Sequence, residues 1–184
     1  MKKINRSEIR ASSLVLLAFS FFTYAEAQQL RSLSGANSPN DDTNPVWIGN
    51  NTLLFTRAFH PSNLGGLNDP GDIWMTQKST NGGWKEATHR PDLSSKGYDL
   101  PLGLQDALTL LILRSESGKN SIHRYSKFGQ EWNYLRQDNL PGLDAFEGPL
   151  SGRVTADGKL IFLAGKRKDG FGNEDLYFSE NTNM

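Results

Sequence analysis

The 184-residue chain contains no cysteine. This absence excludes disulfide bonds, thiolate metal sites, cysteine nucleophiles and lipid-modified cysteine anchors. The formal net charge is zero, because the sequence has 20 basic and 20 acidic side chains. The charge balance therefore gives no reason to expect nucleic acid or an anionic membrane as the main partner. After residue 27 the sequence has no sustained helical periodicity and no apolar run long enough for a transmembrane helix.

The first 27 residues have the order of a secretory signal peptide. Basic residues lie within positions 1–10, an apolar stretch follows at 11–24, and Ala25-Glu26-Ala27 is a small-x-small cleavage triplet. The apolar stretch is short for a membrane anchor, which needs about 20 residues. We predict cleavage after Ala27, export to the periplasm or the outside of the cell, and no stable membrane insertion of the mature chain.

Three short apolar runs recur along the rest of the chain. They are Leu53-Leu54-Phe55-Thr56, Leu110-Leu111-Ile112-Leu113 and Leu160-Ile161-Phe162-Leu163, whose first residues are 57 and then 50 positions apart. Each run is brief and bounded by turn residues, which indicates a buried strand. Asn50-Asn51 and Asp157-Gly158 precede two of the runs, and such pairs tolerate the positive φ angles of tight hairpins.

Each apolar run is flanked by further strand-like segments. Entry strands are expected near 45–48, 100–104 and 149–154, and strands after the runs near 71–75, 121–125 and 174–178. A tryptophan then opens the last strand, Trp84 in the first unit and Trp132 in the second, and we expect both to pack between neighbouring units. The repeating unit is thus four strands in about 50 residues.

Repeated four-stranded antiparallel units are typical of β-propeller blades. We predict an all-β, propeller-like fold with two complete four-stranded blades and an incomplete third, after the N-terminal signal peptide. The expected ranges are 1–27 for the signal peptide, 28–43 for an extended segment, and 44–184 for the repeats. Within the repeats, blade 1 covers about 44–91, blade 2 about 92–143 and blade 3 about 144–184. The alternative is an irregular β-sandwich whose strands resemble one another by accident.

The landmarks of the first and third units resemble a known repeat. The first unit has residues 37–45, an Asn-Asn turn, the apolar run and Gly71-Asp72-Ile73-Trp74, and the third has the matching segments 156–162 and 170–177. This pattern resembles the TolB-like, WD-type propeller repeat of bacterial envelope proteins, over roughly residues 36–180. The resemblance implies a propeller fold and an envelope or secreted setting, but it is unspecific for function.

Known propellers close with at least four blades, whereas this chain supplies two and part of a third. We therefore expect a truncated gene product or an open arc that needs a partner. An open arc exposes apolar faces and strand edges, so self-association through the open blade edges is expected.

The loop at 60–72 is the longest polar insertion and contains candidate ligand-binding residues. Asn68, Asp69 and Asp72 could offer oxygen ligands to calcium, and Asp175 lies in a similar set in the third unit. The other interpretation is that Asp72 and Asp175 hold turns, because a residue that recurs at the same place in each unit is more often architectural. No metal site is assigned, and calcium is the one cofactor considered.

Arg57 and Arg114 follow the first two apolar runs and complete the candidate ligand-binding set. Trp74, Trp84 and Trp132 supply flat apolar surfaces, and aromatic faces beside polar loops bind sugars or peptides. Because Trp84 and Trp132 recur at the same place in two units, packing between neighbouring blades is the preferred interpretation for them, and Trp74 is expected in the core as well.

Propeller folds also include glycosidases, which need two or three carboxylates converging on one sugar. Candidate carboxylates are Asp41, Asp42, Asp72, Asp144, Glu147 and Asp175. Sequence spacing does not show that any of them converge. The three histidines lack metal-ligand spacing, and neither Gly-x-Ser-x-Gly nor a phosphate-binding loop occurs. No catalytic residue is therefore assigned.

The preferred prediction is an exported, non-catalytic binding or scaffold module. It would bind an envelope protein, a peptide or a cell-wall glycan through loops on one face, with no nucleic-acid partner. The alternative is a fragment of a propeller-fold glycoside hydrolase.

Overall fold

Regular structure in the described part of the chain is almost entirely β-strand. The computed structural model describes residues 29–180, and the predicted signal peptide lies outside them. Within that range the chain forms eleven strands and three short 3-10 helices. None of the described residues belongs to a helix with the length and hydrophobicity that a membrane crossing requires. The predicted all-β class is confirmed.

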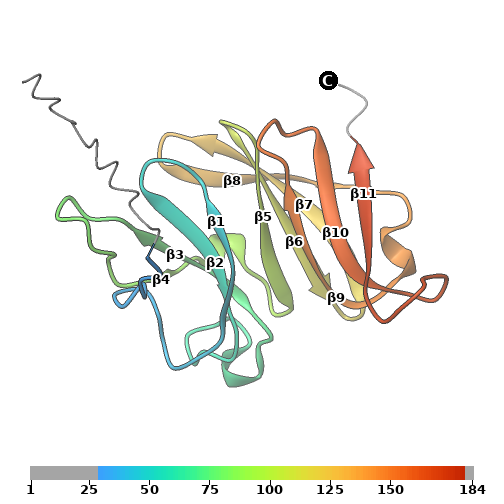
Figure 1. Cartoon of the computed structure of the whole chain (residues 1–184), viewed down its shortest axis with the longest axis horizontal. Coiled ribbons are helices and arrows are strands. Elements are labelled where there is room, and N and C mark those ends of the chain that lie inside the picture. Colours follow the sequence, from blue (N-terminus) through green and yellow to red (C-terminus); the bar gives the residue numbers. More distant parts are fainter. Residues whose placement is uncertain (1–28, 181–184) are drawn as a thin grey trace, which may run out of the picture. The chain divides into compact units, whose positions relative to one another are not determined.

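The strands form three separate antiparallel sheets, which we call blades 1, 2 and 3 (Figure 1). Blade 1 consists of β1 (Asp42–Trp47), β2 (Thr52–Arg57), β3 (Asp72–Gln77) and β4 (Thr88–His89). Blade 2 consists of β5 (Tyr98–Asp106), β6 (Thr109–Glu116), β7 (Lys119–Phe128) and β8 (Glu131–Asp138). Blade 3 consists of β9 (Phe146–Val154), β10 (Leu160–Arg167) and β11 (Asp175–Glu180), with no fourth strand among the described residues. The predicted four, four and three strands are confirmed.

Each predicted apolar run lies in a different sheet, in β2, β6 and β10. Figure 1 shows the sheets as a fan in which blade 2 lies between blades 1 and 3. The three runs therefore do not share one continuous sheet. Separate four-stranded sheets stacked in sequence order are the arrangement of consecutive propeller blades in an open arc.

Two hydrophobic layers fill the spaces between the blades. The layer between blades 1 and 2 combines Val46, Ile48, Leu54 and Ile73 with Leu110, Ile112, Tyr125 and Trp132. The layer between blades 2 and 3 combines Leu100, Leu102, Leu111, Leu113 and Ile122 with Phe146, Leu150, Val154 and Leu163. Since successive residues of a strand point to opposite faces, β6 contributes alternate residues to both layers.

The other face of blade 1 is partly covered by the segment before β1. Phe55 and Trp74 point to this face and pack with Leu33, Ala36 and Ala87. The segment lies so close that a Cβ atom on Gly35 would be 2.1 Å from the carbonyl oxygen of Trp84. Residues 33–36 therefore seal part of a face that no other blade covers among the described residues.

The predicted hairpin turns have the expected backbone conformation. Asn50 and Asn51 have φ angles of 48° and 56°, and Gly158 has a φ of 72°. Gly158 is also required by its surroundings, because a Cβ atom there would be 1.8 Å from the carbonyl oxygen of Gln105 in blade 2. The β9–β10 turn is thus packed directly against the neighbouring blade.

Trp84 departs from its predicted role, whereas Trp132 confirms it. Trp132 lies at the start of β8 and is buried between blades 1 and 2. Trp84 forms only an isolated bridge with Lys78, and β4 begins later, at Thr88. The extra residue of a bulge interrupts the pairing between these points. Trp84 instead packs edge to face on Trp47 of its own blade, with 6.2 Å between ring centroids.

Candidate functional site

Arg57 and Arg114, two of the predicted ligand-binding residues, each bind an aspartate on the first strand of their own blade. Arg57 Nε donates to Asp42 Oδ1, and Arg114 Nε donates to Asp99 Oδ1, both at 2.7 Å. In each blade the aspartate precedes the arginine by 15 residues. The two pairs are therefore one repeated contact that ties the first strand of a blade to its second.

The same aspartates also hold the turns that lead into their strands. Asp42 Oδ2 accepts the Ser38 N–H at 3.0 Å, and Asp99 Oδ2 accepts the Ser95 N–H at 2.6 Å. Asp175 accepts the Phe171 N–H at 2.8 Å, again from four residues earlier. The architectural interpretation of Asp175 accounts for this contact.

Asp69 and Asp72 hold the β2–β3 loop, which comprises residues 58–71. Asp69 accepts the N–H groups of Gly65 at 2.7 Å and Gly71 at 2.9 Å. Asp72 Oδ2 accepts the Leu64 N–H at 2.7 Å and lies 2.6 Å from His89 Nε2. Both carboxylates are buried, whereas Asn68 is exposed on the loop. The three predicted oxygen ligands therefore do not converge on one point.

A buried amide adds to the support of this loop. Asn63 Nδ2 donates to the carbonyl oxygen of Arg57 at 2.8 Å, and Asn63 Oδ1 accepts from Trp74 Nε1 at 3.0 Å. The guanidinium carbon of Arg57 lies 4.4 Å from the centroid of the Trp74 ring. Side-chain hydrogen bonds of this kind, made in a buried setting, fix the loop backbone against β2 and β3.

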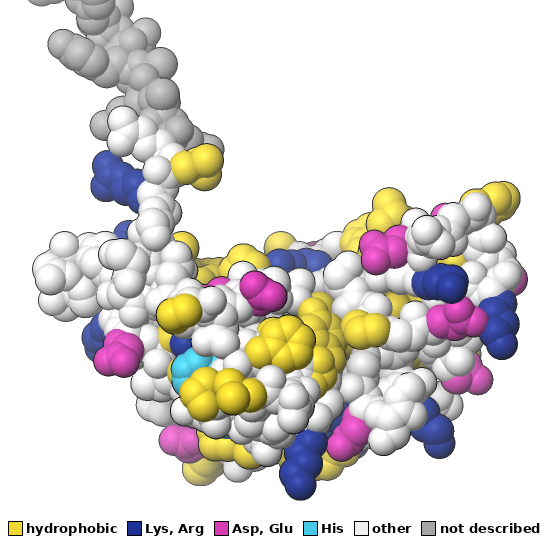
Figure 2. Space-filling view, turned by 90° about the horizontal axis from the view of Figure 1, so that it is seen from below, with side chains coloured by type: hydrophobic (Ala, Val, Ile, Leu, Met, Phe, Trp, Pro, Cys, Tyr) yellow, Lys and Arg dark blue, Asp and Glu magenta, His cyan; other side chains and the backbone are white. Residues whose placement is uncertain are grey.

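The fixed loop presents apolar side chains to solvent. Phe59, Leu64 and Leu67 are all exposed. Figure 2 views the end of the molecule on which this loop lies and shows hydrophobic side chains at the surface beside a histidine. Phe59 also has a φ of 53°, a left-handed conformation that is costly for a bulky residue.

The histidines take part in separate hydrogen bonds. His60 Nδ1 accepts the Ser62 N–H at 3.1 Å, and His123 Nε2 lies 2.9 Å from Ser121 Oγ. No cluster of three histidine, aspartate or glutamate side chains suited to a metal ion occurs within residues 29–180.

Burial alters the proton affinity of several of these groups. It raises the pKa of Asp99 to about 6, an effect that the positive charge of Arg114 only partly offsets. Burial, together with the charge of Arg114, lowers the pKa of His123 to about 4. Burial also raises the pKa of Asp72, against the opposing effects of the Leu64 N–H and His89. Asp99 is therefore stabilised in its protonated form and His123 in its neutral form.

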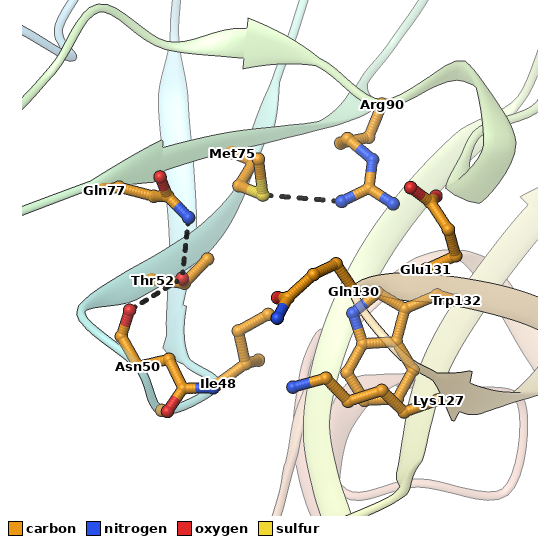
Figure 3. A pocket seen from close by; sticks show the side chains of 11 residues that line it. Ile48, Asn50, Thr52, Met75, Gln77, Arg90, Lys127, Gln130, Glu131 and Trp132 are labelled. Atoms are coloured by element: carbon orange, nitrogen blue, oxygen red, sulfur yellow. Dashed lines mark hydrogen bonds between the residues drawn. The ribbon is translucent and has the colours of Figure 1, made fainter.

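A groove of about 400 Å³ opens where the β1–β2 turn of blade 1 meets the β7–β8 turn of blade 2 (Figure 3). Its apolar lining comes from Ile48, Met75 and Trp132. Lys127 lies beside the Trp132 ring, with Nζ 5.6 Å from the ring centroid. Arg90 borders the groove and contacts the Met75 sulfur at 3.4 Å.

Three amide side chains give this groove its hydrogen-bonding capacity. Asn50, Gln77 and Gln130 line it, and Gln77 bonds weakly to Thr52 Oγ1 at 3.4 Å. Each amide offers both donors and acceptors, and Arg90, Lys127 and Glu131 add charged groups to the same lining. Sequence reasoning missed these residues, because Asn50 and Gln130 lie at turns of two different units, Gln77 ends a strand, and only Trp132 marked the place.

Comparisons with known proteins give a similarity of fold. No family model matches the chain, and no curated protein matches it. Among solved structures, TolB from Acinetobacter baumannii is similar, with 18% sequence identity and a TM-score of 0.48. The match covers 79% of this chain and 30% of the TolB chain, so this chain spans under a third of the structure it resembles.

Proposed function

We propose that this chain is an exported, non-catalytic binding module whose β2–β3 loop holds an apolar segment of a peptide or an envelope protein. The N-terminal sequence pattern supports export. The loop supports binding, because it combines a fixed backbone with exposed apolar side chains. Such surfaces bind partners at a reduced entropic cost, since little ordering remains to be done on association.

The proposal depends most on Phe59, which has a left-handed backbone and an exposed side chain. Its backbone is held in a left-handed conformation by two hydrogen bonds, from Phe59 N–H to Asp69 O and from Asn40 Nδ2 to Phe59 O, both at 2.8 Å. The strain of a bulky residue in this region is about 1–3 kcal/mol. Phe59 is still 48% exposed among the described residues, so only part of its surface is buried to offset this strain. A partner that covers the ring would supply that burial.

The proposed contact surface is apolar. Leu64 and Leu67 flank the glycine pair of the same loop, while Asp69 and Asp72 are directed into the protein. A partner would therefore meet aliphatic and aromatic side chains and not the predicted acidic residues. Asp69 and Asp72 serve binding indirectly, by positioning the loop.

The experiment is a selection of a random peptide library displayed on phage against the purified chain. We expect enriched peptides rich in apolar residues. Their affinity should fall about tenfold or more for the double variant Phe59→Asn, Leu67→Ser. Asparagine tolerates the left-handed backbone, so this variant should keep or slightly raise its free energy of unfolding.

The matched control is Leu108→Ser, which removes an exposed leucine from the β5–β6 turn. It should leave peptide affinity unchanged. Peptides that bind the loop variant and the parent chain equally, or a library that yields no enriched peptide, would overturn the proposal.

Glycan binding is a second candidate function, and the groove between blades 1 and 2 favours it. The amide side chains of the groove suit the polar hydroxyl groups of a sugar, and its apolar lining suits the apolar faces of the sugar ring. Isothermal titration with N-acetylglucosamine and glucose tests this candidate. Gln77→Ala and Gln130→Ala should each abolish the binding heat, and Leu108→Ser should not.

The hydrolase alternative needs two carboxylates free to act on one sugar. Asp42 is bound to Arg57, Asp72 to Leu64 N–H and His89, and Asp175 to the turn before it. These internal contacts support the non-catalytic proposal.

A further inference from the structure

The outward face of blade 3 presents apolar side chains to water. Phe162, Leu176 and Phe178 are 47%, 85% and 67% exposed. Phe162 and Phe178 are register partners on β10 and β11, with ring centroids 6.4 Å apart. Leu176 pairs with Ala164 on the same side of the sheet. The three side chains thus form one patch, which we call the blade 3 patch.

Strand register identifies the equivalent residues in blade 1. Gly165 pairs with Asp175 in blade 3 as Arg57 pairs with Asp72 in blade 1. Phe162 and Leu54 each lie three residues before the first member of these pairs, so they occupy equivalent positions. By the same register Leu176 corresponds to Ile73, and Phe178 corresponds to Met75. Leu54 and Ile73 have no exposed surface, because blade 2 covers them. The blade 3 patch is therefore the face that another blade covers elsewhere in this molecule.

Blade 1 also has a face that is partly open to solvent, on the side that points away from blade 2. Trp47 and Leu53 are register partners on the side of blade 1 that points away from blade 2. Trp47 is 51% exposed. A small apolar groove of about 120 Å³ lies beside them, lined in part by Leu33, Pro45 and Phe55. The segment at 33–36 covers Phe55 and Trp74 but leaves Trp47 half-exposed.

We propose that the blade 3 patch packs on this outward face of blade 1 in a second copy of the chain. In both observed contacts between blades, the face of one blade that points toward the next blade in the sequence packs on the face of that next blade that points back. Among the described residues the chain has one exposed face of the first kind, on blade 3, and one partly open face of the second kind, on blade 1. Joining them between two copies repeats a contact that the fold already makes twice. Such a head-to-tail contact closes into a ring if the rotation permits it.

This inference concerns a surface distinct from the β2–β3 loop and does not depend on the proposed function. Sedimentation velocity of the purified full chain over a range of concentrations tests it. We expect reversible association, weakened about tenfold or more by Phe162→Ser, Phe178→Ser. Leu176→Ser is the milder variant, because that side chain is almost wholly exposed, and it should weaken association without loss of the far-ultraviolet circular dichroism of the fold.

Mixing two defective variants tests the head-to-tail geometry. At a concentration where the parent chain associates, Trp47→Ser and the Phe162→Ser, Phe178→Ser variant should each stay monomeric because their association is weaker, and their equimolar mixture should form a heterodimer. The mixture retains one intact interface, between blade 1 of the phenylalanine variant and blade 3 of the tryptophan variant. Association of two blade 3 patches with each other would instead leave Trp47→Ser associated, and mixing would rescue nothing.

The loop variant Phe59→Asn, Leu67→Ser is the control and should associate like the parent chain. A parent chain that stays monomeric throughout, association that ignores the blade 3 substitutions, or Trp47→Ser chains that associate normally would each overturn the proposal. A parent chain that self-associates but enriches no peptide would count against the loop proposal alone.

Discussion

Arg114 binds the fully buried carboxylate of Asp99, with 2.7 Å between Nε and Oδ1. The arginine's charge favours ionised Asp99 and disfavours protonated His123 on the next strand. The two titrating groups are thus linked through one cation. Their pKa values shift in opposite directions and pass each other, from 3.8 to about 6 for Asp99 and from 6.5 to about 4 for His123.

Asp99 and His123 should give opposite slopes of stability against pH. The folded chain holds the Asp99 proton more tightly than the unfolded chain, so this contribution is complete below pH 3.8 and lost as the pH rises through 6. The folded chain resists protonation of His123, so that contribution is complete above pH 6.5 and lost as the pH falls through about 4.

Urea unfolding of Asp99→Asn and His123→Gln between pH 4 and 6.5 checks this pair. Relative to the parent chain, Asp99→Asn should become more stable as the pH rises, and His123→Gln should become less stable. Equal slopes in both variants would show that the two groups do not titrate as described.

Gly158→Ala should destabilise the chain far more than Gly118→Ala. Both glycines have positive φ angles, 72° and 75°. A Cβ atom on Gly118 meets nothing within 4 Å, whereas one on Gly158 would collide with the Gln105 backbone. We expect a cost of about 1 kcal/mol at Gly118 and about 3 kcal/mol or more at Gly158. Thermal unfolding measures both, and similar costs would contradict the close contact between blades 2 and 3.

Ile73→Ala and Leu176→Ala compare equivalent positions that differ in burial. Ile73 is fully covered by blade 2, so its truncation should cost about 2–5 kcal/mol. Leu176 is exposed in a single chain, so its truncation should change stability by about 0.5 kcal/mol or less. Urea unfolding at a low protein concentration, where association is absent, is the measurement. A large cost at Leu176 would mean that its face is covered within one chain.

Calcium should have no effect on thermal stability. Asp69, Asp72 and Asp175 already accept N–H groups of their own loops, so at least one oxygen of each carboxylate that a calcium ion would need is already engaged. Melting with excess EDTA and with millimolar calcium should give midpoints within about 1 °C of each other. A clear rise with calcium would restore the metal interpretation of these loops.

The fold was predictable because its signals are local and repeated. Three apolar runs bounded by turn residues were sufficient to place β2, β6 and β10 in separate sheets. Trp84 was misplaced because pattern alone does not reveal the bulge before Thr88.

The candidate site was less accessible from the sequence. The pairing of Asp42 with Arg57 was visible in principle, since Asp99 and Arg114 repeat its spacing of 15 residues. Whether a given aspartate points outward or into its own loop depends on backbone geometry that spacing does not encode. The exposure of Phe59 and the amide groove likewise depend on how turns from different blades meet.

The unequal cover of the two outer sheets has a consequence for how the molecule opens. Residues 33–36 lie over blade 1, whereas none of residues 29–180 covers Phe162 and Phe178 of blade 3 in this way. In stacked repeats the least supported end frays first. Amide hydrogens of β10 and β11 should therefore exchange with solvent earliest among the long strands, and the C-terminal sheet would be the first point of attack for a protease.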